Sequence, residues 1–364
     1  MESWKTIIID NEPIAGFSAD VHGMVNKNKS DHLDDIENAL FAFNKECDER
    51  NINIVFFLGD MFEQKFFVAT EALSRISKAI AKIAEKRTVI ILPGNHDMSH
   101  YDKPDLSLVE VFSHFKNVII ANTDFIIETP NVRFFVSPFS KEPLEHIPSS
   151  IKKDKKNVLC GHFGVKGFIL NPACMDIDIE DSEAIPMESL KQFDKVFLGH
   201  YHGYQKTGNV TYVSAPIQNR HGDENMPHGF VFWDSLTDTE NFVPYENGPS
   251  YMTINFAAND IKKALELSNV HLRVKLNTKI SPEKVATVYK ALLKNHRSVK
   301  IDDSEMRKTD NPKLVVLENF EAHGYKDVAK LLRGYLDRVK ALDKIPAHLS
   351  VDILNTKLQE LEEV

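Results

Sequence analysis

Seven side chains of metal-binding type stand at or just after the ends of short apolar runs in this 364-residue sequence. They are Asp20, His22, Asp60, Asn95, His162, His200 and His202. Imidazole, carboxylate and carboxamide donors in combination suit manganese, iron or zinc better than calcium. A carboxylate such as that of Asp60 can bridge two cations, and two cations about 3.5–4 Å apart can polarise a phosphate and activate water. The residue types therefore indicate a two-metal hydrolase of phosphate esters.

The spacing of these residues fits positions at the ends of strands. In Asp20-Val21-His22 and His200-Tyr201-His202, both donors fall on one side of an extended segment, because side chains alternate along a strand. A glycine directly precedes the polar group in four of the five places, at Gly59, Gly94, Gly161 and Gly199. Glycine permits a sharp turn out of a strand, and ligands of open α/β sheets bind at the carboxyl ends of the strands. We therefore expect the donors to meet at one sheet edge.

The apolar runs that precede these groups predict buried strands, because runs this short and this apolar are typical of strands covered on both faces. They span residues 14–17, 54–58, 89–92, 158–159 and 196–198. Apolar residues recur at intervals of three or four over 34–49 and 69–86, which predicts two amphipathic helices. Residues 118–139 and 210–243 have the pattern of successive strands. The elements together predict an α/β fold, a β-sandwich flanked by helices.

The sequence after residue 245 predicts a separate, smaller unit. Asn247-Gly248-Pro249 predicts a boundary, and the residues from 251 to 302 then alternate strand, helix, strand, helix and strand. The expected divisions are a metal-binding domain at 1–246, a small α/β cap at 247–302, a linker at 303–316 and a helical hairpin at 317–364. The hairpin has only short apolar stripes, so binding to a partner and packing on the main domain are both compatible with it.

The net charge, the apolar runs and the cysteines restrict the partners and the compartment that we expect. The formal net charge of -9 and pI of about 5.9 disfavour a protein that binds DNA strongly by itself, but not a nuclease subunit with a partner. No run of eighteen apolar residues occurs and the start lacks the profile of a signal peptide, so no membrane span is expected. Cys47, Cys160 and Cys174 form no paired motif, which disfavours a structural zinc site and predicts thiols in a reducing cytoplasm.

The series Asp-x-His, Gly-Asp, Gly-Asn-His-Asp, Gly-His and Gly-His-x-His resembles the calcineurin-like metallophosphoesterases over residues 14–243, roughly two thirds of the chain. Within that superfamily the sequence resembles the SbcD-type recombination nucleases, subunits of SbcC–SbcD and Mre–Rad complexes, and especially their T-even-like phage version. The stretches that carry this likeness are 161–163 with 167–168, 209–212, 222–225 and 228–230 with Asp234.

The resemblance implies a four-layer sandwich and two divalent cations, usually Mn²⁺ with Mg²⁺ possible. One would be held by Asp20, His22, Asp60 and His202. The other would be held by Asp60, Asn95, His162 and His200. His96 would protonate the leaving oxygen or stabilise charge near the scissile phosphate, with Asp97 orienting its imidazole. Some relatives have a further histidine three residues after the aspartate of Gly-Asp, and it assists catalysis as a second helper. This chain has Glu63 there, which puts that role in doubt.

The resemblance also implies partners. These are DNA, an ATPase of the SbcC or Rad type at the terminal hairpin, and a second copy of the chain through helices near 69–86 and 105–115. The basic candidates for contact with DNA in the cap are Lys262, Lys263, Arg273 and Lys275. A solvated helical face explains those residues equally well.

Two other functions remain open. A phosphatase or small-molecule phosphodiesterase of the same superfamily, such as one acting on cyclic nucleotides, shares most core motifs. The protein phosphatases, however, tend to show Gly-Asp-x-x-Asp-Arg and Gly-Asn-His-Glu, which Gly59–Glu63 and Gly94–Asp97 do not match. Because the cyclic-nucleotide phosphodiesterases share nearly all the core motifs, only the residues after about 245 separate them from a nuclease, and those residues favour the nuclease. A non-catalytic scaffold should have lost ligands, and none of the seven is missing.

Overall fold

The computed structural model describes residues 5–23, 30–100, 106–145, 147, 151, 153–169, 184–278 and 280–304. The chain divides into two compact units, Met1–Lys275 with Ile280–Ile301, and Leu276–Lys279 with Asp302–Val364. Most of the linker expected at 303–316, and all of the hairpin expected at 317–364, lie outside the described residues. None of the helices in the described ranges has the length and apolarity to cross a lipid bilayer.

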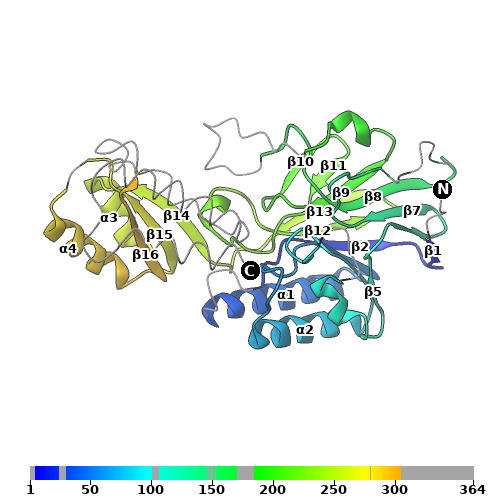
Figure 1. The fold of residues 1–364 in the computed structure, drawn as a ribbon, viewed down its shortest axis with the longest axis horizontal. Helices are drawn as coiled ribbons and strands as arrows, with labels where there is room; N and C mark the ends of the chain where they lie inside the picture. The colour runs from blue at the N-terminus through cyan, green and yellow to red at the C-terminus, as the bar shows by residue number, and fades with distance from the viewer. Residues whose placement is uncertain are drawn as a thin grey trace, which may run out of the picture. The chain divides into compact units, whose positions relative to one another are not determined.

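Two large sheets form the part of the first unit that carries the candidate ligands (Figure 1). The six-stranded sheet contains β2 (Ile14–Ser18), β3 (Ile54–Leu58), β4 (Thr88–Leu92), β5 (Val118–Ile120), β12 (Gly229–Asp234) and β13 (Thr239–Pro244). Its strand order is β13-β12-β2-β3-β4-β5. Neighbours from β2 to β5 are parallel, whereas β12 is antiparallel to both β2 and β13.

The seven-stranded sheet contains β1 (Lys5–Ile8), β6 (Phe125–Glu128), β7 (Val132–Ser137), β8 (Lys156–His162), β9 (Lys195–Gly199), β10 (Gln205–Thr207) and β11 (Val210–Tyr212). Its strand order is β1-β6-β7-β8-β9-β11-β10, and β7, β8 and β9 are parallel neighbours. The successive strands predicted over 118–139 and 210–243 are present as β5 to β7 and β11 to β13.

Alternating side chains place the two sheets face to face. Phe56 and Leu58 of β3 point into the layer between the sheets, whereas Val55 and Phe57 point to the opposite side. Across that layer, the rings of Phe17 in β2 and Phe197 in β9 stack with centroids 4.1 Å apart. All five residues of β3 are buried, as predicted for a strand covered on both faces.

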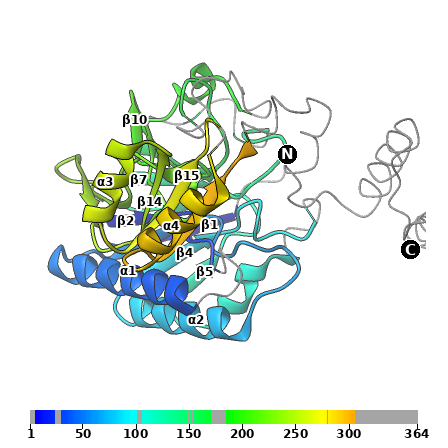
Figure 2. The ribbon, with the colours of Figure 1, turned by 90° about the vertical axis from the view of Figure 1, so that its left-hand side faces the viewer.

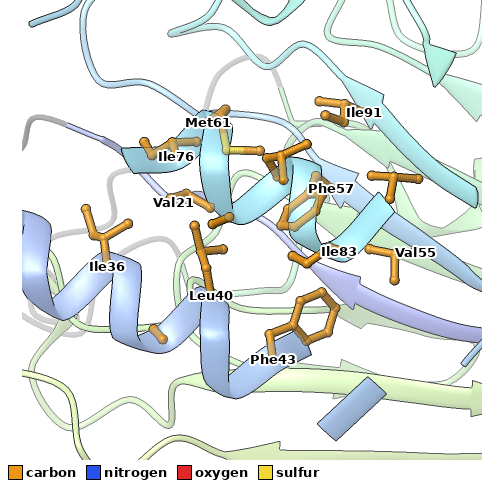
Figure 3. Packing of buried hydrophobic residues seen from close by; sticks show 14 of the residues in the cluster. Val21, Ile36, Leu40, Phe43, Val55, Phe57, Met61, Ile76, Ile83 and Ile91 are labelled. Atoms are coloured by element: carbon orange, nitrogen blue, oxygen red, sulfur yellow. The ribbon is translucent and has the colours of Figure 1, made fainter. Parts of the chain in front are cut away.

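Two helices cover the outer face of the six-stranded sheet. They are α1 (Ser30–Glu49) and α2 (Thr70–Ala84), which lie side by side (Figures 1 and 2). Their apolar stripes interlock with the sheet in one buried cluster, part of which Figure 3 shows: Val21, Ile36, Leu40, Phe43, Val55, Phe57, Met61, Ile76, Ile83 and Ile91. Both predicted helices are therefore present, the first beginning at Ser30, about one turn before the expected start.

The outer face of the seven-stranded sheet buries a separate cluster. Phe135, Leu159 and Val196 of the sheet pack there with Leu190 and Phe193. Leu190 ends η4 (Met187–Leu190), a short 3₁₀ helix. Helix formation near 105–115 is likewise limited, in the described part, to the 3₁₀ helix η2 (Leu108–Phe112).

A third, three-stranded sheet has the order β14-β15-β16. Its elements are β14 (Ser250–Asn255), α3 (Ala258–Glu266), β15 (Val270–Lys275), α4 (Pro282–Leu293) and β16 (Ser298–Asp302). Ala264, Leu272, Val274 and Leu292 form its own small core. Ser281 caps α4 by accepting the backbone N–H of Lys284, with Pro282 at the first helical position.

His32 in α1 is a buried histidine whose protonation should affect the stability of the fold. Its exposed fraction is 4%, and neither ring nitrogen has a hydrogen-bond partner among the described residues. Burial lowers the pKa of His32 to about 4, although Asp35 acts in the opposite direction. An unfolded histidine titrates near pH 6.5, so the unfolded chain takes up this proton first as the pH falls. We expect the free energy of unfolding to decrease by up to roughly 3 kcal/mol between about pH 6.5 and pH 4.

Urea denaturation at a series of pH values measures this effect. His32→Leu should remove the histidine's share of the pH dependence, whereas His114→Leu, which replaces an exposed histidine, should retain it. The same pH dependence in wild type and His32→Leu would show that His32 does not titrate on unfolding.

Candidate metal centre

The seven candidate ligands lie where strands of the two sheets end. Because β2, β3 and β4 are parallel neighbours, the segments that follow them leave the six-stranded sheet at one edge. The ends of β8 and β9 lie together in the seven-stranded sheet for the same reason. Backbone pairing continues past the strands, since the N–H of Asp20 donates to the carbonyl of Gly59 and that of His22 to the carbonyl of Asp60. The segments that carry the candidate ligands therefore leave their strands close together.

Four of the candidate ligands have a left-handed backbone conformation. Their φ angles are 51° at Asp20, 50° at His22, 52° at Asp60 and 99° at His200. Non-glycine residues adopt such angles rarely, and each one costs roughly 1–3 kcal/mol of backbone strain. The tight hydrogen-bonded turns after the strands hold this strain, which clusters at functional sites in other proteins.

One half of the site contains His22, His202 and Asp20, whose ligand atoms lie within 4.8 Å of one another. The Nε2 atoms of His22 and His202 are 3.1 Å apart. The outer nitrogens face carboxylates: Nδ1 of His22 lies 2.6 Å from Glu63 Oε2, and Nδ1 of His202 lies 3.1 Å from Asp223 Oδ1. The Asp223 carboxylate is hydrogen-bonded to Nδ1 of His202, and the Glu63 carboxylate lies against Nδ1 of His22, so in both rings Nε2 is the nitrogen that faces the centre.

The other half contains His162 and Asn95. Nδ1 of His162 donates to the carbonyl of Leu58 at 2.7 Å, and its Nε2 lies 3.2 Å from Asn95 Oδ1. The ring of His200 is edge-on to that of His162, with centroids 5.2 Å apart, and the backbone N–H of His200 donates to the Asp20 carboxylate at 3.1 Å.

Asp60 lies between the two halves. Its Oδ2 is 3.4 Å from Nε2 of His162 and 3.8 Å from Nε2 of His22. The structure thus brings the ligand atoms of Asp20, His22, Asp60, Asn95, His162 and His202 together and places the His200 ring beside that of His162, with the Asp60 carboxylate in the position from which it could bridge two cations.

The donor set fits divalent cations. The Nε2 atoms of His22 and His202 face each other across 3.1 Å, a separation that a proton or a metal ion between the two rings can bridge. Asp20 and Asp60 are almost wholly buried, and within the described ranges neither pairs with a lysine or arginine. Buried carboxylates without such partners are stabilised by coordinating metal ions.

Without a metal ion, protonated histidines supply part of the positive charge beside the buried carboxylates. Although burial alone lowers it, the pKa of His162 rises to about 9 beside the Asp60 carboxylate. Burial acts to raise the pKa of Asp60, but His162 and His22 hold that pKa well below its usual range. A cation at Nε2 of His162 must therefore displace a proton, so metal binding releases protons into solution.

His96 and Asp97 lie beside the centre but do not pair as expected. Nδ1 of His96 donates to the backbone carbonyl of Glu63 at 2.8 Å. The Asp97 carboxylate instead accepts the backbone N–H groups of Gly94, Met61 and Phe62 at 2.9–3.1 Å. The expectation that Asp97 orients the His96 imidazole is thus wrong in this structure. Asp97 fixes the loops that carry Asp60 and Asn95, because a buried carboxylate accepts the amides that those loops expose.

Gly59 is a position where a side chain would disturb the site. Its φ is 87°, and an added Cβ would contact the His162 ring and approach the Cα of Gly94 to 2.9 Å. Gly208 also has a positive φ, 59°, but nothing lies within 4 Å of its added Cβ. We expect Gly59→Ala to lower the free energy of unfolding by about 1–3 kcal/mol more than Gly208→Ala, since only the first overpacks its surroundings. Urea denaturation of both variants measures the difference, and equal losses would mean that the contact carries no cost.

Spacing alone does not identify three residues that contact the candidate ligands. Glu63 and Asp223 hold His22 and His202, and the Asn219 side chain donates to the backbone carbonyl of Asp20 at 3.1 Å. In the sequence, Glu63 stands out only as a departure from a family pattern, and Asp223 only as part of a matching stretch. The sequence signal for Asp223 is its position directly after Gly222, in the segment that follows the Gly-His-x-His motif ending at His202.

The four basic candidates for DNA contact lie on the three-stranded sheet and one of its helices. Lys262 and Lys263 are exposed on α3. Arg273 and Lys275 are partly buried and alternate along β15, on the face opposite Leu272 and Val274.

Comparison with known proteins places this centre in a family. A family model described as calcineurin-like phosphoesterase matches residues 16–204, more than half of the chain. Exonuclease subunit 1 of Enterobacteria phage T4 is 24% identical over 273 residues, 68% of this chain and 74% of that protein. The SbcD subunit of nuclease SbcCD from Staphylococcus epidermidis is 25% identical over 240 residues, 58% of this chain but only 64% of that protein.

The range matched by the family model contains the centre. Residues 16–204 include all seven candidate ligands and the segments that connect them. The names of both relatives describe subunits of nucleases. The chain belongs to the calcineurin-like phosphoesterase family, whose members act through divalent metal ions.

Proposed function

We propose that the protein is the nuclease subunit of a recombination and repair complex of the SbcC–SbcD type and hydrolyses DNA phosphodiesters with two divalent cations. The observation that carries the proposal is the position of Asp60, whose carboxylate lies within 4 Å of a histidine Nε2 on each side. Two neighbouring cations that share such a carboxylate stabilise the attacking and leaving oxygens of a phosphoryl transfer. The nuclease names of both relatives support a nucleic acid as the substrate, and DNA is the one we propose.

Each ligand has a proposed place. Asp20, His22, Asp60 and His202 would hold one cation. Asp60, Asn95, His162 and His200 would hold the other. When bound, the cations supply Lewis acidity to the phosphate and lower the pKa of a water molecule. Manganese is the proposed ion, with magnesium as the alternative, because imidazole and carboxylate donors are mixed.

His96 is the proposed proton donor to the leaving oxygen. Its Nδ1–H is committed to the carbonyl of Glu63 at 2.8 Å, which fixes the ring and leaves Nε2 as the atom that can give up a proton. Its ring lies edge-on to that of His22, with centroids 5.1 Å apart. The bond between phosphorus and the leaving oxygen would break as that oxygen takes the proton from His96.

The finer parts of the proposal concern partners. The terminal residues 317–364 would bind an SbcC- or Rad-like ATPase, the cap at 247–302 would contact DNA, and two copies of the chain would form a homodimer. The acidic net charge of -9 supports dependence on a partner for DNA affinity. The protein would act in the cytoplasm, that of the host cell if a phage encodes it.

Incubation of the purified chain with end-labelled linear and hairpin DNA tests the proposal. Manganese, magnesium and chelator are compared, with bis-p-nitrophenyl phosphate as a second substrate. We expect degradation of DNA that requires manganese or magnesium and stops with chelator. Turnover of the small ester with DNA left intact, even after addition of an SbcC-type ATPase, would favour a small-molecule phosphodiesterase instead.

A further inference from the structure

Three of the four candidate histidine ligands, His22, His202 and His162, differ in the groups that their outer nitrogens meet. In one half, Nδ1 of His22 faces Glu63 at 2.6 Å and Nδ1 of His202 faces Asp223 at 3.1 Å. In the other half, Nδ1 of His162 donates to the neutral backbone carbonyl of Leu58 at 2.7 Å. Two ligands of the first half are therefore backed by a negative charge, whereas His162 is not.

This difference affects how strongly each half attracts a cation. A carboxylate that accepts the Nδ1 proton makes an imidazole more basic and fixes its orientation. The effect is largest where water is excluded, as at the Asp223 side chain, which is 4% exposed. The Glu63 side chain is 31% exposed, but its carboxylate lies directly against the buried His22 ring. The second half includes the uncharged amide of Asn95 beside His162.

We propose that Glu63 and Asp223 are positioning residues that make the His22–His202 half the tighter of the two cation positions. The inference rests on the proposed two-metal centre and adds an order to it. The position at His22 and His202 fills first as the concentration of divalent cation rises, and the position at His162 and Asn95 fills second.

The structure allows the Glu63 carboxylate to be tested apart from the Glu63 backbone. Glu63 holds two rings by different atoms, since its carboxylate faces His22 and its backbone carbonyl accepts the Nδ1–H of His96. Glu63→Gln removes the charge next to His22 and leaves the contact with His96 in place. Asp223→Asn is less clean, because Asp223 Oδ2 also accepts the backbone N–H groups of Asn219 and Arg220.

The chain offers a matched control. Glu224 Oε1 lies 2.6 Å from Nδ1 of His221, a carboxylate–histidine pair of the same kind whose histidine is not among the candidate ligands. Glu224→Gln therefore removes a comparable charge one residue from Asp223 without touching His22 or His202.

Equilibrium titration with manganese, followed by the electron paramagnetic resonance signal of free Mn²⁺, measures both positions. We expect two binding steps in the wild type, with the tighter one weakened about 10- to 100-fold in Glu63→Gln and in Asp223→Asn. Glu224→Gln should bind as the wild type does. His162→Ala should abolish the weaker step and retain the tighter one, which assigns each step to its half.

The inference is overturned if both steps are unchanged in a folded Glu63→Gln, or if the weaker step is the one affected. Circular dichroism establishes folding, and Glu63→Gln decides the question if Asp223→Asn does not fold. The titration contains no DNA, so its result is separate from the nuclease proposal. A chain that cleaves DNA but fills both positions equally contradicts only the order of filling. A chain with the expected order that leaves DNA intact contradicts only the nuclease activity.

Discussion

Asp60→Asn should reduce phosphodiester hydrolysis roughly 1000-fold and reduce bound manganese from two ions per chain to at most one. The substitution keeps the shape of the side chain and an oxygen that can accept the N–H of His96, which Asp60 Oδ1 accepts at 2.8 Å. It removes only the charge that lies between His22 and His162. Loss of about 4 kcal/mol of transition-state stabilisation corresponds to a rate reduction of roughly 1000-fold.

Turnover of bis-p-nitrophenyl phosphate and manganese content after desalting measure this result. Asp34→Asn is the matched control, because Asp34 is an aspartate of α1 whose side chain is 53% exposed. It should retain full activity and both ions. An Asp60→Asn enzyme that kept two ions and lost less than tenfold in rate would show that Asp60 does not bridge them.

His96→Ala should reduce the cleavage of DNA by roughly 10²- to 10⁴-fold while both manganese ions stay bound. The proposed role of His96 is to give a proton to the leaving oxygen, and the sugar oxygen of DNA is a poor leaving group without one. The p-nitrophenolate of the small ester leaves readily as an anion. We therefore expect a loss of less than about tenfold on bis-p-nitrophenyl phosphate, which separates proton donation from positioning of the phosphate.

Steady-state rates on both substrates, with manganese content, test this prediction. His100→Ala, an exposed histidine four residues further on, should behave as the wild type. Equal losses on DNA and on the small ester would contradict proton donation. A loss of bound metal would instead make His96 part of the cation site.

Local pattern was sufficient for most of the sandwich. Strand β3 consists of Ile, Val, Phe, Phe and Leu, a run that only burial on both faces can satisfy, and all five residues are buried. The three- to four-residue spacing of Ile36, Leu40 and Phe43 likewise predicts the face of α1 that packs on the sheet. Near residue 110, only a 3₁₀ helix forms in the described chain, because the short apolar stretch cannot specify helix length.

The candidate ligands could be predicted because each is a metal-binding residue type at or just after the end of a predicted strand. The hydrogen-bond partners of side chains such as Asp97 could not, because several partners are compatible with the sequence. Asp97 follows His96 directly, yet its carboxylate bonds to amides on two loops that the fold brings around it. Glu63 and Asp223 contact histidines 41 and 21 residues away in the sequence, His22 and His202, and such pairs arise only from the way the strand ends converge.

Crystals of the full chain grown with manganese, with anomalous diffraction recorded at the manganese edge, test the central claim most directly. The claim is that five strand ends form one site for two cations. We predict two anomalous peaks on either side of the Asp60 carboxylate, one in contact with His22 and His202 and the other with His162 and Asn95. A single peak, or peaks away from these strand ends, would contradict the two-metal centre and the hydrolytic mechanism built on it.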